Sequence, residues 1–133
     1  MKEIVGIVLV CHSNSMADAF IEFCEVLKQD DFEILNGGGE NYDTYGTTPE
    51  IVAQSIREAN RGKGVLLLVD FGSSINAALG AKELLKGEIE VEIADCPLIE
   101  GAISAIAGND EDTDLKTLKL ISEDSKNFRK IKS

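Results

Sequence analysis

Hydrophobic residues gather in four short runs along the chain, and each run is followed by a stretch in which they recur at every third or fourth position. Short apolar runs are typical of strands buried in a parallel sheet, whereas the spaced stretches are typical of amphipathic helices. We expect strands at residues 4–11, 32–35, 65–69 and 88–94. The last run alternates between apolar and polar residues, which predicts a strand at an edge of the sheet.

The stretches between and after the strands predict five helices. Thr47 or Thr48 suits the start of the second helix because Pro49 follows in its first turn, and Gly87 marks the end of the third. Two helices show an apolar face at helical spacing, with Met16, Phe20, Phe23, Cys24 and Leu27 in the first and Ile75, Ala78, Leu79, Ala81 and Leu85 in the third. We expect these faces to pack against the sheet.

The alternation of strand and helix, repeated four times, predicts the fold class. Parallel strands joined by right-handed crossovers form a doubly wound α/β sheet with helices on both faces, in three layers. We expect one domain, residues 1–133, in which residues 109–133 form an acidic loop and a C-terminal helix. The economical strand order is the flavodoxin-like 2-1-3-4, in which the winding reverses between strands 1 and 3, so the loops after these strands flank one crevice.

Each of these two loops begins near a residue suited to catalysis. His12, the only histidine, follows the first strand, and Asp70 follows the third. A carboxylate that accepts a hydrogen bond from one ring nitrogen of a neutral imidazole fixes the tautomer and leaves the other nitrogen free as a nucleophile. The topology therefore predicts His12 as a nucleophile oriented by Asp70, although Asp70 could equally cap the helix that follows it.

Small residues around the same crevice suit an anion, because hydroxyl groups and the free backbone amides at the start of a helix attract phosphate. The candidates for binding phosphate are Ser13, Thr47, Gly72, Ser73 and Ser74. Cys11 stands beside His12, but a cysteine at the end of a buried strand is expected to pack inertly. The crevice thus resembles a site for phosphate chemistry.

Composition narrows the range of partners. The chain has 24 acidic and 13 basic residues and a net charge of −11, which opposes binding to the phosphate backbone of nucleic acid or to an anionic membrane. Its 3 cysteines have no CxxC spacing, and no run approaches the roughly 18 apolar residues of a membrane-spanning helix. We expect a cytoplasmic protein with no nucleic-acid partner, no membrane insertion and no metal.

Four segments resemble those of one family, the mannose-type IIA domains of the phosphoenolpyruvate-dependent sugar phosphotransferase system. They are residues 7–13, which end in His-Ser, and the stretches YGTTPEI (45–51), VDFGSS (69–74) and CPLIEGA (96–102). The Pro-Leu-Ile-Glu-Gly sequence is similar to the branch that serves dihydroxyacetone kinase rather than to the sugar-transporter branch. The chain departs from the family pattern at Cys11, where serine usually precedes the histidine, and at Ala19, where glycine often follows it.

This resemblance implies a function. His12 would accept a phosphoryl group from the phosphocarrier protein HPr and pass it to an ADP bound on the nucleotide-binding subunit of dihydroxyacetone kinase. The protein would need no cofactor of its own. The habit of the family implies a homodimer.

Three other functions match parts of the sequence. A IIA component of a mannose-family sugar transporter would use the same chemistry but would pass the phosphate to a IIB domain. A flavodoxin-like protein would bind FMN at this crevice, with Tyr42 or Tyr45 to stack on the flavin because the chain has no tryptophan. A receiver-like domain would be phosphorylated on Asp70 but would require an acidic pair after the first strand, which this chain lacks.

Overall fold

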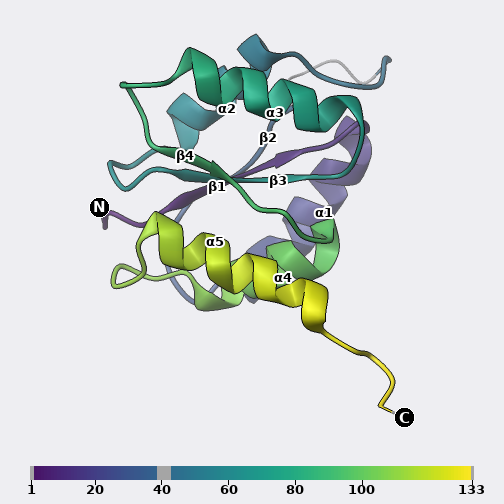
Figure 1. Cartoon of the computed structure of the whole chain (residues 1–133), viewed down its shortest axis with the longest axis vertical. Coiled ribbons are helices and arrows are strands. Elements are labelled where there is room, and N and C mark those ends of the chain that lie inside the picture. Colours follow the sequence, from purple (N-terminus) through teal and green to yellow (C-terminus); the bar gives the residue numbers. More distant parts are fainter. Residues whose placement is uncertain (1, 39–42, 133) are drawn as a thin grey trace.

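The computed structural model describes residues 2–38 and 43–132, and a parallel sheet lies at the centre of this part of the chain (Figure 1). Its strands are β1 (Gly6–Val10), β2 (Ile34–Asn36), β3 (Val65–Val69) and β4 (Val91–Ile93). They are arranged in the order β2-β1-β3-β4, which confirms the predicted order and the predicted edge position of β4. Tyr42, one of the two tyrosines considered for a flavin, lies outside the described residues.

Helices cover both faces of the sheet and form the outer two of three layers, as predicted. They are α1 (Asn14–Leu27), α2 (Pro49–Ala59), α3 (Ser73–Leu84), α4 (Leu98–Gly108) and α5 (Leu115–Glu123), followed by the short 3₁₀ helix η1 (Asp124–Asn127). α2 and α3 lie above the sheet in the view of Figure 1, whereas α1, α4 and α5 lie below it.

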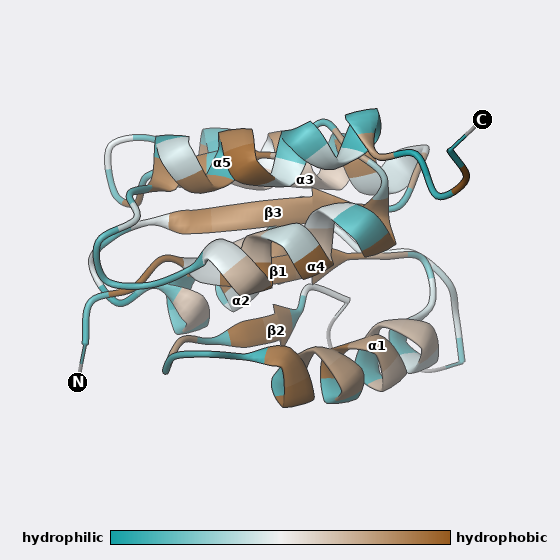
Figure 2. Cartoon of the chain, turned by 90° about the horizontal axis from the view of Figure 1, so that it is seen from below, coloured by the Kyte–Doolittle hydropathy of each residue, from teal (hydrophilic) through white to brown (hydrophobic). Residues whose placement is uncertain are grey.

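Alternate residues of the central strands face opposite layers, because successive side chains of a strand point to opposite sides. In β1, Ile7 and Leu9 pack with the α1, α4 and α5 layer, whereas Val8 and Val10 pack with the α2 and α3 layer. These four side chains have no exposed surface, and burying each one contributes roughly 1.5–3 kcal/mol. Figure 2 shows the strands as hydrophobic and the helices as mixed, with polar residues turned outward.

The register of β1 against β3 positions the functional loops. The two strands pair from Gly6 with Val65 to Val10 with Val69, so their carboxyl ends are level. The backbone amide of Asp70 then donates to the carbonyl of Val10 over 3.2 Å, which extends the pairing by one residue. The loops that follow the two strands therefore leave the sheet side by side.

The predicted helix faces are wrong in part, because four large apolar side chains remain exposed: Met16, Phe23, Ile75 and Leu79. Small residues such as Ala17 in α1 and Ala77 in α3 are buried in their place. A small side chain lets a helix approach the sheet closely, so each helix is turned toward its alanines. The larger apolar residues beside them then lie on the flank of the helix, at the surface.

The acidic loop before α5 does cap that helix as predicted, since Asp114 accepts a hydrogen bond of 2.8 Å from the amide of Thr117. The chain then leaves the body of the molecule after η1, and Lys130 in this tail forms a 2.8 Å ion pair with Glu100 of α4 (Figure 1). None of the helices in the described residues has the length and apolar character that crossing a membrane requires.

Candidate active site

His12 and Asp70 meet at the carboxyl edge of the sheet. The backbone amide of His12 donates to Asp70 Oδ2 over 2.8 Å, and the ring nitrogen Nδ1 lies 3.0 Å from Oδ2 and 3.1 Å from Oδ1. The two residues are 58 positions apart in sequence, so the topology brings them together as the strand order predicts. One carboxylate thus anchors the backbone of His12 and also orients its ring.

The environment of Asp70 keeps its carboxylate ionised. Burial of this side chain, which is 7% exposed, would by itself raise its pKa. Hydrogen bonds from the His12 amide, from the Ser74 and His12 side chains and from the Phe71 amide outweigh burial and lower the pKa of Asp70. An ionised Asp70 is a hydrogen-bond acceptor and favours the tautomer with an N–H at Nδ1, which leaves the free lone pair of the His12 ring on Nε2.

The start of α3 lies against the imidazole. Ser73 Oγ is 3.0 Å from His12 Nε2, and Ser74 Oγ is 3.1 Å from Nδ1. Gly72 precedes both serines with a φ of 56°, a left-handed conformation that favours glycine, and a Cβ at this position would lie 4.0 Å from His12 Cε1. Nε2 therefore faces the amino end of a helix, where the helix dipole favours an anion.

The side chain of Ser13 stabilises the start of a helix in this structure. Its hydroxyl accepts a hydrogen bond of 3.2 Å from the amide of Met16 and so caps the start of α1. The structure does not bring this hydroxyl to a nitrogen of His12, although the two residues are neighbours in sequence. Of the predicted phosphate ligands, it is Gly72, Ser73 and Ser74 that the structure gathers around the ring.

The loop before α2 reaches His12 through its backbone. The amide of Gly46 donates to the carbonyl of His12 over 2.8 Å, whereas the hydroxyl of Thr47 donates to the carbonyl of Gly37 over 2.8 Å. The Thr47 side chain therefore ties its loop to the residues that follow β2. This hydroxyl lies at the same edge of the sheet as the imidazole, but it is hydrogen-bonded to the carbonyl of Gly37.

Phe71 is the functional candidate that the sequence analysis missed. Its ring stacks on the His12 imidazole, with the ring centroids 4.4 Å apart and the planes inclined by 12°. The side chain is nevertheless 64% exposed, so it does not belong to the core. The signal in the sequence was an aromatic residue placed in a loop directly after a candidate catalytic carboxylate.

Cys11 lies beneath the site, between the end of β1 and His12, with only 1% of its surface exposed. Burial raises the pKa of its thiol to about 12, and the nearby negative charge of Asp70 adds to this shift. The predicted burial of this residue is confirmed. The raised pKa of the thiol supports its predicted inertness, which stays a prediction.

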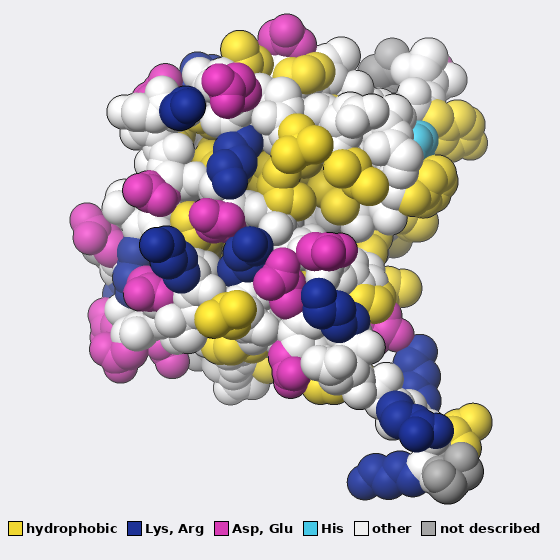
Figure 3. Space-filling view, in the orientation of Figure 1, with side chains coloured by type: hydrophobic (Ala, Val, Ile, Leu, Met, Phe, Trp, Pro, Cys, Tyr) yellow, Lys and Arg dark blue, Asp and Glu magenta, His cyan; other side chains and the backbone are white. Residues whose placement is uncertain are grey.

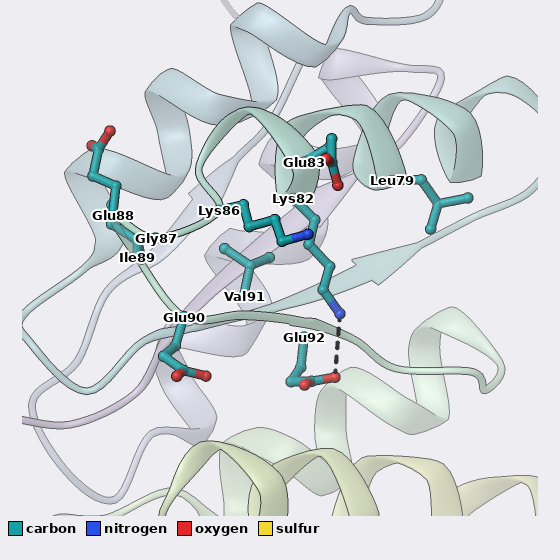
Figure 4. Close-up of a pocket in the computed structure, with 10 residues that line it drawn as sticks. All are labelled: Leu79, Lys82, Glu83, Lys86, Gly87, Glu88, Ile89, Glu90, Val91 and Glu92. Atoms are coloured by element: carbon teal, nitrogen blue, oxygen red, sulfur yellow. Dashed lines mark ion pairs between the residues drawn. The ribbon is translucent and has the colours of Figure 1, made fainter.

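The imidazole is partly exposed at the surface of the described residues. His12, the cyan side chain at the edge of Figure 3, is 26% exposed and lies beside hydrophobic side chains. A hollow between α3 and the edge strand β4, lined by residues such as Leu79, Lys82 and Glu92, belongs to another part of the surface and includes none of the site residues (Figure 4). A partly exposed imidazole beside hydrophobic side chains is suited to contact with another protein.

Carboxylates and cysteines do not gather into a metal site in the part of the chain that the structure describes. Within residues 2–38 and 43–132, no group of three or more His, Cys, Asp and Glu side chains could hold a metal ion. The arrangement around His12 instead combines an oriented nucleophilic nitrogen with hydroxyl groups and a helix amino terminus. This combination is suited to accepting a phosphoryl group.

Curated relatives of the chain carry one name. The DhaM phosphoryl donor subunit of the PEP-dependent dihydroxyacetone kinase 2 of Listeria innocua is 32% identical over 103 residues, covering 76% of this chain and 82% of that protein. The DhaM subunits of Providencia stuartii and Escherichia coli are 27% and 30% identical, over 77% and 76% of this chain. The chain spans only 23% and 22% of the lengths of these last two proteins.

The fold and the sequence family agree with each other. The crystal structure of a protein of unknown function, EF1359, superposes with a TM-score of 0.74 over 93% of this chain and 95% of that one, at 24% identity, which shows a shared fold. The model of the EIIA-man family, described as the PTS system fructose IIA component, matches residues 6–119. The chain therefore belongs to the EIIA-man family of IIA components of the phosphotransferase system.

Proposed function

We propose that this protein is a phosphoryl carrier in which Nε2 of His12 accepts a phosphoryl group and then passes it on. The observation that supports this role most directly is the contact of Nδ1 with the Asp70 carboxylate, at 3.0 and 3.1 Å. It fixes the proton on Nδ1 and turns the lone pair of Nε2 toward the amino end of α3. Membership of a family of phosphotransferase IIA components supports the same chemistry.

The bonds and electron pairs of this phosphoryl transfer balance without a cofactor. The lone pair of Nε2 forms a bond to phosphorus while the phosphorus–nitrogen bond of a phosphohistidine donor breaks and its electron pair returns to the donor ring. The proton of Nδ1 stays in its hydrogen bond with Asp70, whose negative charge compensates the ring. Since phosphoryl transfer depends mainly on positioning and on stabilising the equatorial oxygens, the protein needs oriented donors rather than further reactive groups.

The phosphoryl oxygens would lie among the small residues at the start of α3. The Ser73 hydroxyl, 3.0 Å from Nε2 in the free protein, would turn to donate to one of them, and Gly72 and Ser74 would line the same space. Ser13 and Thr47 are proposed as additional ligands. Each of these two would have to exchange its present partner, the Met16 amide or the Gly37 carbonyl, for the phosphate.

For the donor and acceptor we propose HPr and an ADP bound to the nucleotide-binding subunit of dihydroxyacetone kinase. The names of the curated relatives and the sequence at residues 97–101 support this branch. In that stretch Ile99 is 54% exposed at the start of α4 and offers an apolar contact to a partner. The family description as a fructose component supports the alternative acceptor, a sugar-transporter IIB domain.

The phosphorylation itself is tested by incubating the protein with phosphoenolpyruvate, enzyme I and HPr and then measuring its mass. The wild type should gain one phosphoryl group, and His12→Ala should gain none, because the chain has no other histidine. Acid-labile, base-stable phosphate would identify phosphohistidine. A phosphorylated His12→Ala protein would show that His12 is not the acceptor.

The acceptor is tested by mixing the phosphorylated protein with either candidate. Rapid formation of ATP on an ADP-loaded dihydroxyacetone kinase subunit, with no transfer to a IIB domain, is the expected result. Transfer to the IIB domain alone would assign the protein to the sugar-transporter branch and leave the chemistry of His12 unchanged. We also propose that the protein acts in the cytoplasm as a homodimer, and a monomeric mass in light scattering would contradict the latter.

A further inference from the structure

The position of the Phe71 side chain is not explained by packing in the hydrophobic core. Its ring is 64% exposed, yet it lies flat on the imidazole of His12, with the centroids 4.4 Å apart and the planes within 12° of parallel. The backbone amide of Phe71 donates to Asp70 Oδ1, the carboxylate that also binds Nδ1 of His12, over 2.6 Å. One carboxylate therefore binds both the imidazole of His12 and the backbone amide of the residue whose ring stacks on it.

We propose that Phe71 is a positioning residue that favours the phosphorylated form of His12 over the free form, because its ring faces an imidazole that gains positive charge on phosphorylation. This inference rests on the proposed phosphorylation of His12. Phe71 forms no bond to phosphorus and donates no proton. It acts on the ring that carries the phosphoryl group.

The stacking geometry leaves the path of the phosphoryl group open. The lone pair of Nε2 lies in the plane of the imidazole, whereas Phe71 covers a face of that ring. The in-plane direction is the one in which Ser73 Oγ lies, at 3.0 Å from Nε2. Phe71 can therefore remain in contact with His12 before, during and after the transfer.

The charge of the imidazole differs between the two forms. In the nucleophilic form the ring is neutral, with its proton on Nδ1, the tautomer that the contacts of Nδ1 with Asp70 at 3.0 and 3.1 Å favour. When Nε2 bonds to phosphorus and Nδ1 keeps its proton, the ring itself becomes cationic. The face of a phenyl ring is electron-rich and attracts a cation within about 6 Å of its centroid, so the contact with Phe71 strengthens on phosphorylation.

An equilibrium measurement separates this role from docking. An exposed aromatic residue beside a nucleophile could also contact the donor protein, but such a contact changes the forward and reverse rates together and leaves the equilibrium between the separated proteins unchanged. Stabilisation of the phosphorylated ring changes that equilibrium. The ratio of the phosphorylated to the free form, measured against a known ratio for HPr, is therefore the decisive quantity.

The experiment compares Phe71→Leu, Phe71→Tyr and Leu79→Ala with the wild type in the full chain. Phosphorylated HPr and each protein are brought to equilibrium without enzyme I, and the four species are quantified by intact mass. Leu79 is a matched control because it is an apolar side chain, 54% exposed, in the helix that follows Phe71. It lines the hollow of Figure 4, which includes none of the site residues. NMR signals of the His12 ring protons report the stack itself through the ring current of residue 71.

We expect Phe71→Leu to lower the equilibrium constant for phosphorylation about two- to five-fold, the range for an exposed cation–π contact. Phe71→Tyr should retain the wild-type value, and Leu79→Ala should leave it unchanged. An unaltered equilibrium constant in Phe71→Leu would overturn the inference while leaving His12 as the acceptor, and so would ring-proton signals that do not move. A wild-type protein that takes no phosphoryl group would instead overturn the proposed function.

Discussion

Two helices begin beside His12, and they use their first hydroxyl groups differently. α1 is capped by the side chain of Ser13, whose hydroxyl accepts from the amide of Met16. α3 begins after Gly72, which has no side chain to cap it, and the hydroxyls of Ser73 and Ser74 lie within 3.1 Å of the imidazole nitrogens. A serine that caps a helix is committed to the backbone, whereas a serine after a glycine cap is available to the site.

The difference between the two helix starts has a physical origin in the backbone. Ser13 has φ −108° and ψ 116°, the extended conformation in which a cap side chain reaches the amide three residues on. Gly72 has φ 56° and ψ −125°, which turns the chain so that the next two side chains point back toward β1. Asp70, not the cap residue, then accepts a hydrogen bond from the backbone amide of Phe71. The α3 side of the crevice is thus organised for His12 and the α1 side for its own helix.

The strongest test of this comparison removes the charge that organises the α3 side. In Asp70→Asn, one of the two acceptor oxygens becomes an amide donor and faces the N–H of the His12 backbone, the Phe71 backbone or the imidazole. Transfer from HPr should slow about 10²- to 10⁴-fold, the usual range for groups that set the state of a catalytic base. Rapid-quench measurement of phosphoryl transfer gives this rate.

Urea unfolding of the same variant is the control. Because the folded protein lowers the pKa of Asp70, the ionised carboxylate adds stability above its unfolded pKa of about 3.9, and this contribution is lost as the pH falls through the lower folded pKa. The unfolding free energies of wild type and Asp70→Asn should therefore converge in acid. A variant that transfers as fast as the wild type would reduce Asp70 to a residue that orders its loop.

A matched pair of serine variants tests the comparison directly. Ser73→Ala should slow transfer about two- to ten-fold, the equivalent of one hydrogen bond, with little change in stability. Ser13→Ala should lower the free energy of unfolding by about 1 kcal/mol, the usual effect of losing a helix cap. It should slow transfer less than Ser73→Ala does, because Ser13 binds the phosphate only by releasing the amide of Met16. The opposite pattern, with slower transfer in Ser13→Ala and lower stability in Ser73→Ala, would make Ser13 the principal hydroxyl ligand of the phosphate.

Substitution of Thr47 should have the smallest effect on the phosphorylated form, because the hydroxyl has a hydrogen-bond partner whether or not it binds the phosphoryl group. To bind a phosphoryl oxygen it must release the carbonyl of Gly37, so the gain and the loss nearly cancel. Thr47→Val should change the half-life of the phosphohistidine by less than about two-fold, while the lost bond to Gly37 lowers the unfolding free energy by about 1 kcal/mol. A much shorter half-life would place Thr47 among the principal phosphate ligands.

The features that the sequence predicted are those that follow from topology. Alternating strands and helices define the order β2-β1-β3-β4, and that order alone brings His12 against Asp70 across 58 residues. The features that it did not predict depend on small rotations. The direction of the Ser13 hydroxyl, the stacking of Phe71 and the exposure of Leu79 are set by a single glycine φ or by the turn of a helix about its axis, which hydrophobic spacing does not resolve.

The burial of Cys11 should determine which of two adjacent side chains reacts with an electrophile. Burial raises the pKa of this thiol to about 12, so the reactive thiolate form is disfavoured at neutral pH and this sulfur should not compete with the adjacent imidazole. The two potential nucleophiles, Cys11 and His12, are adjacent in the chain, and burial makes Cys11 the less reactive of the two. Peroxide and alkylating agents should therefore leave Cys11 untouched in the folded protein while the imidazole next to it stays open to modification.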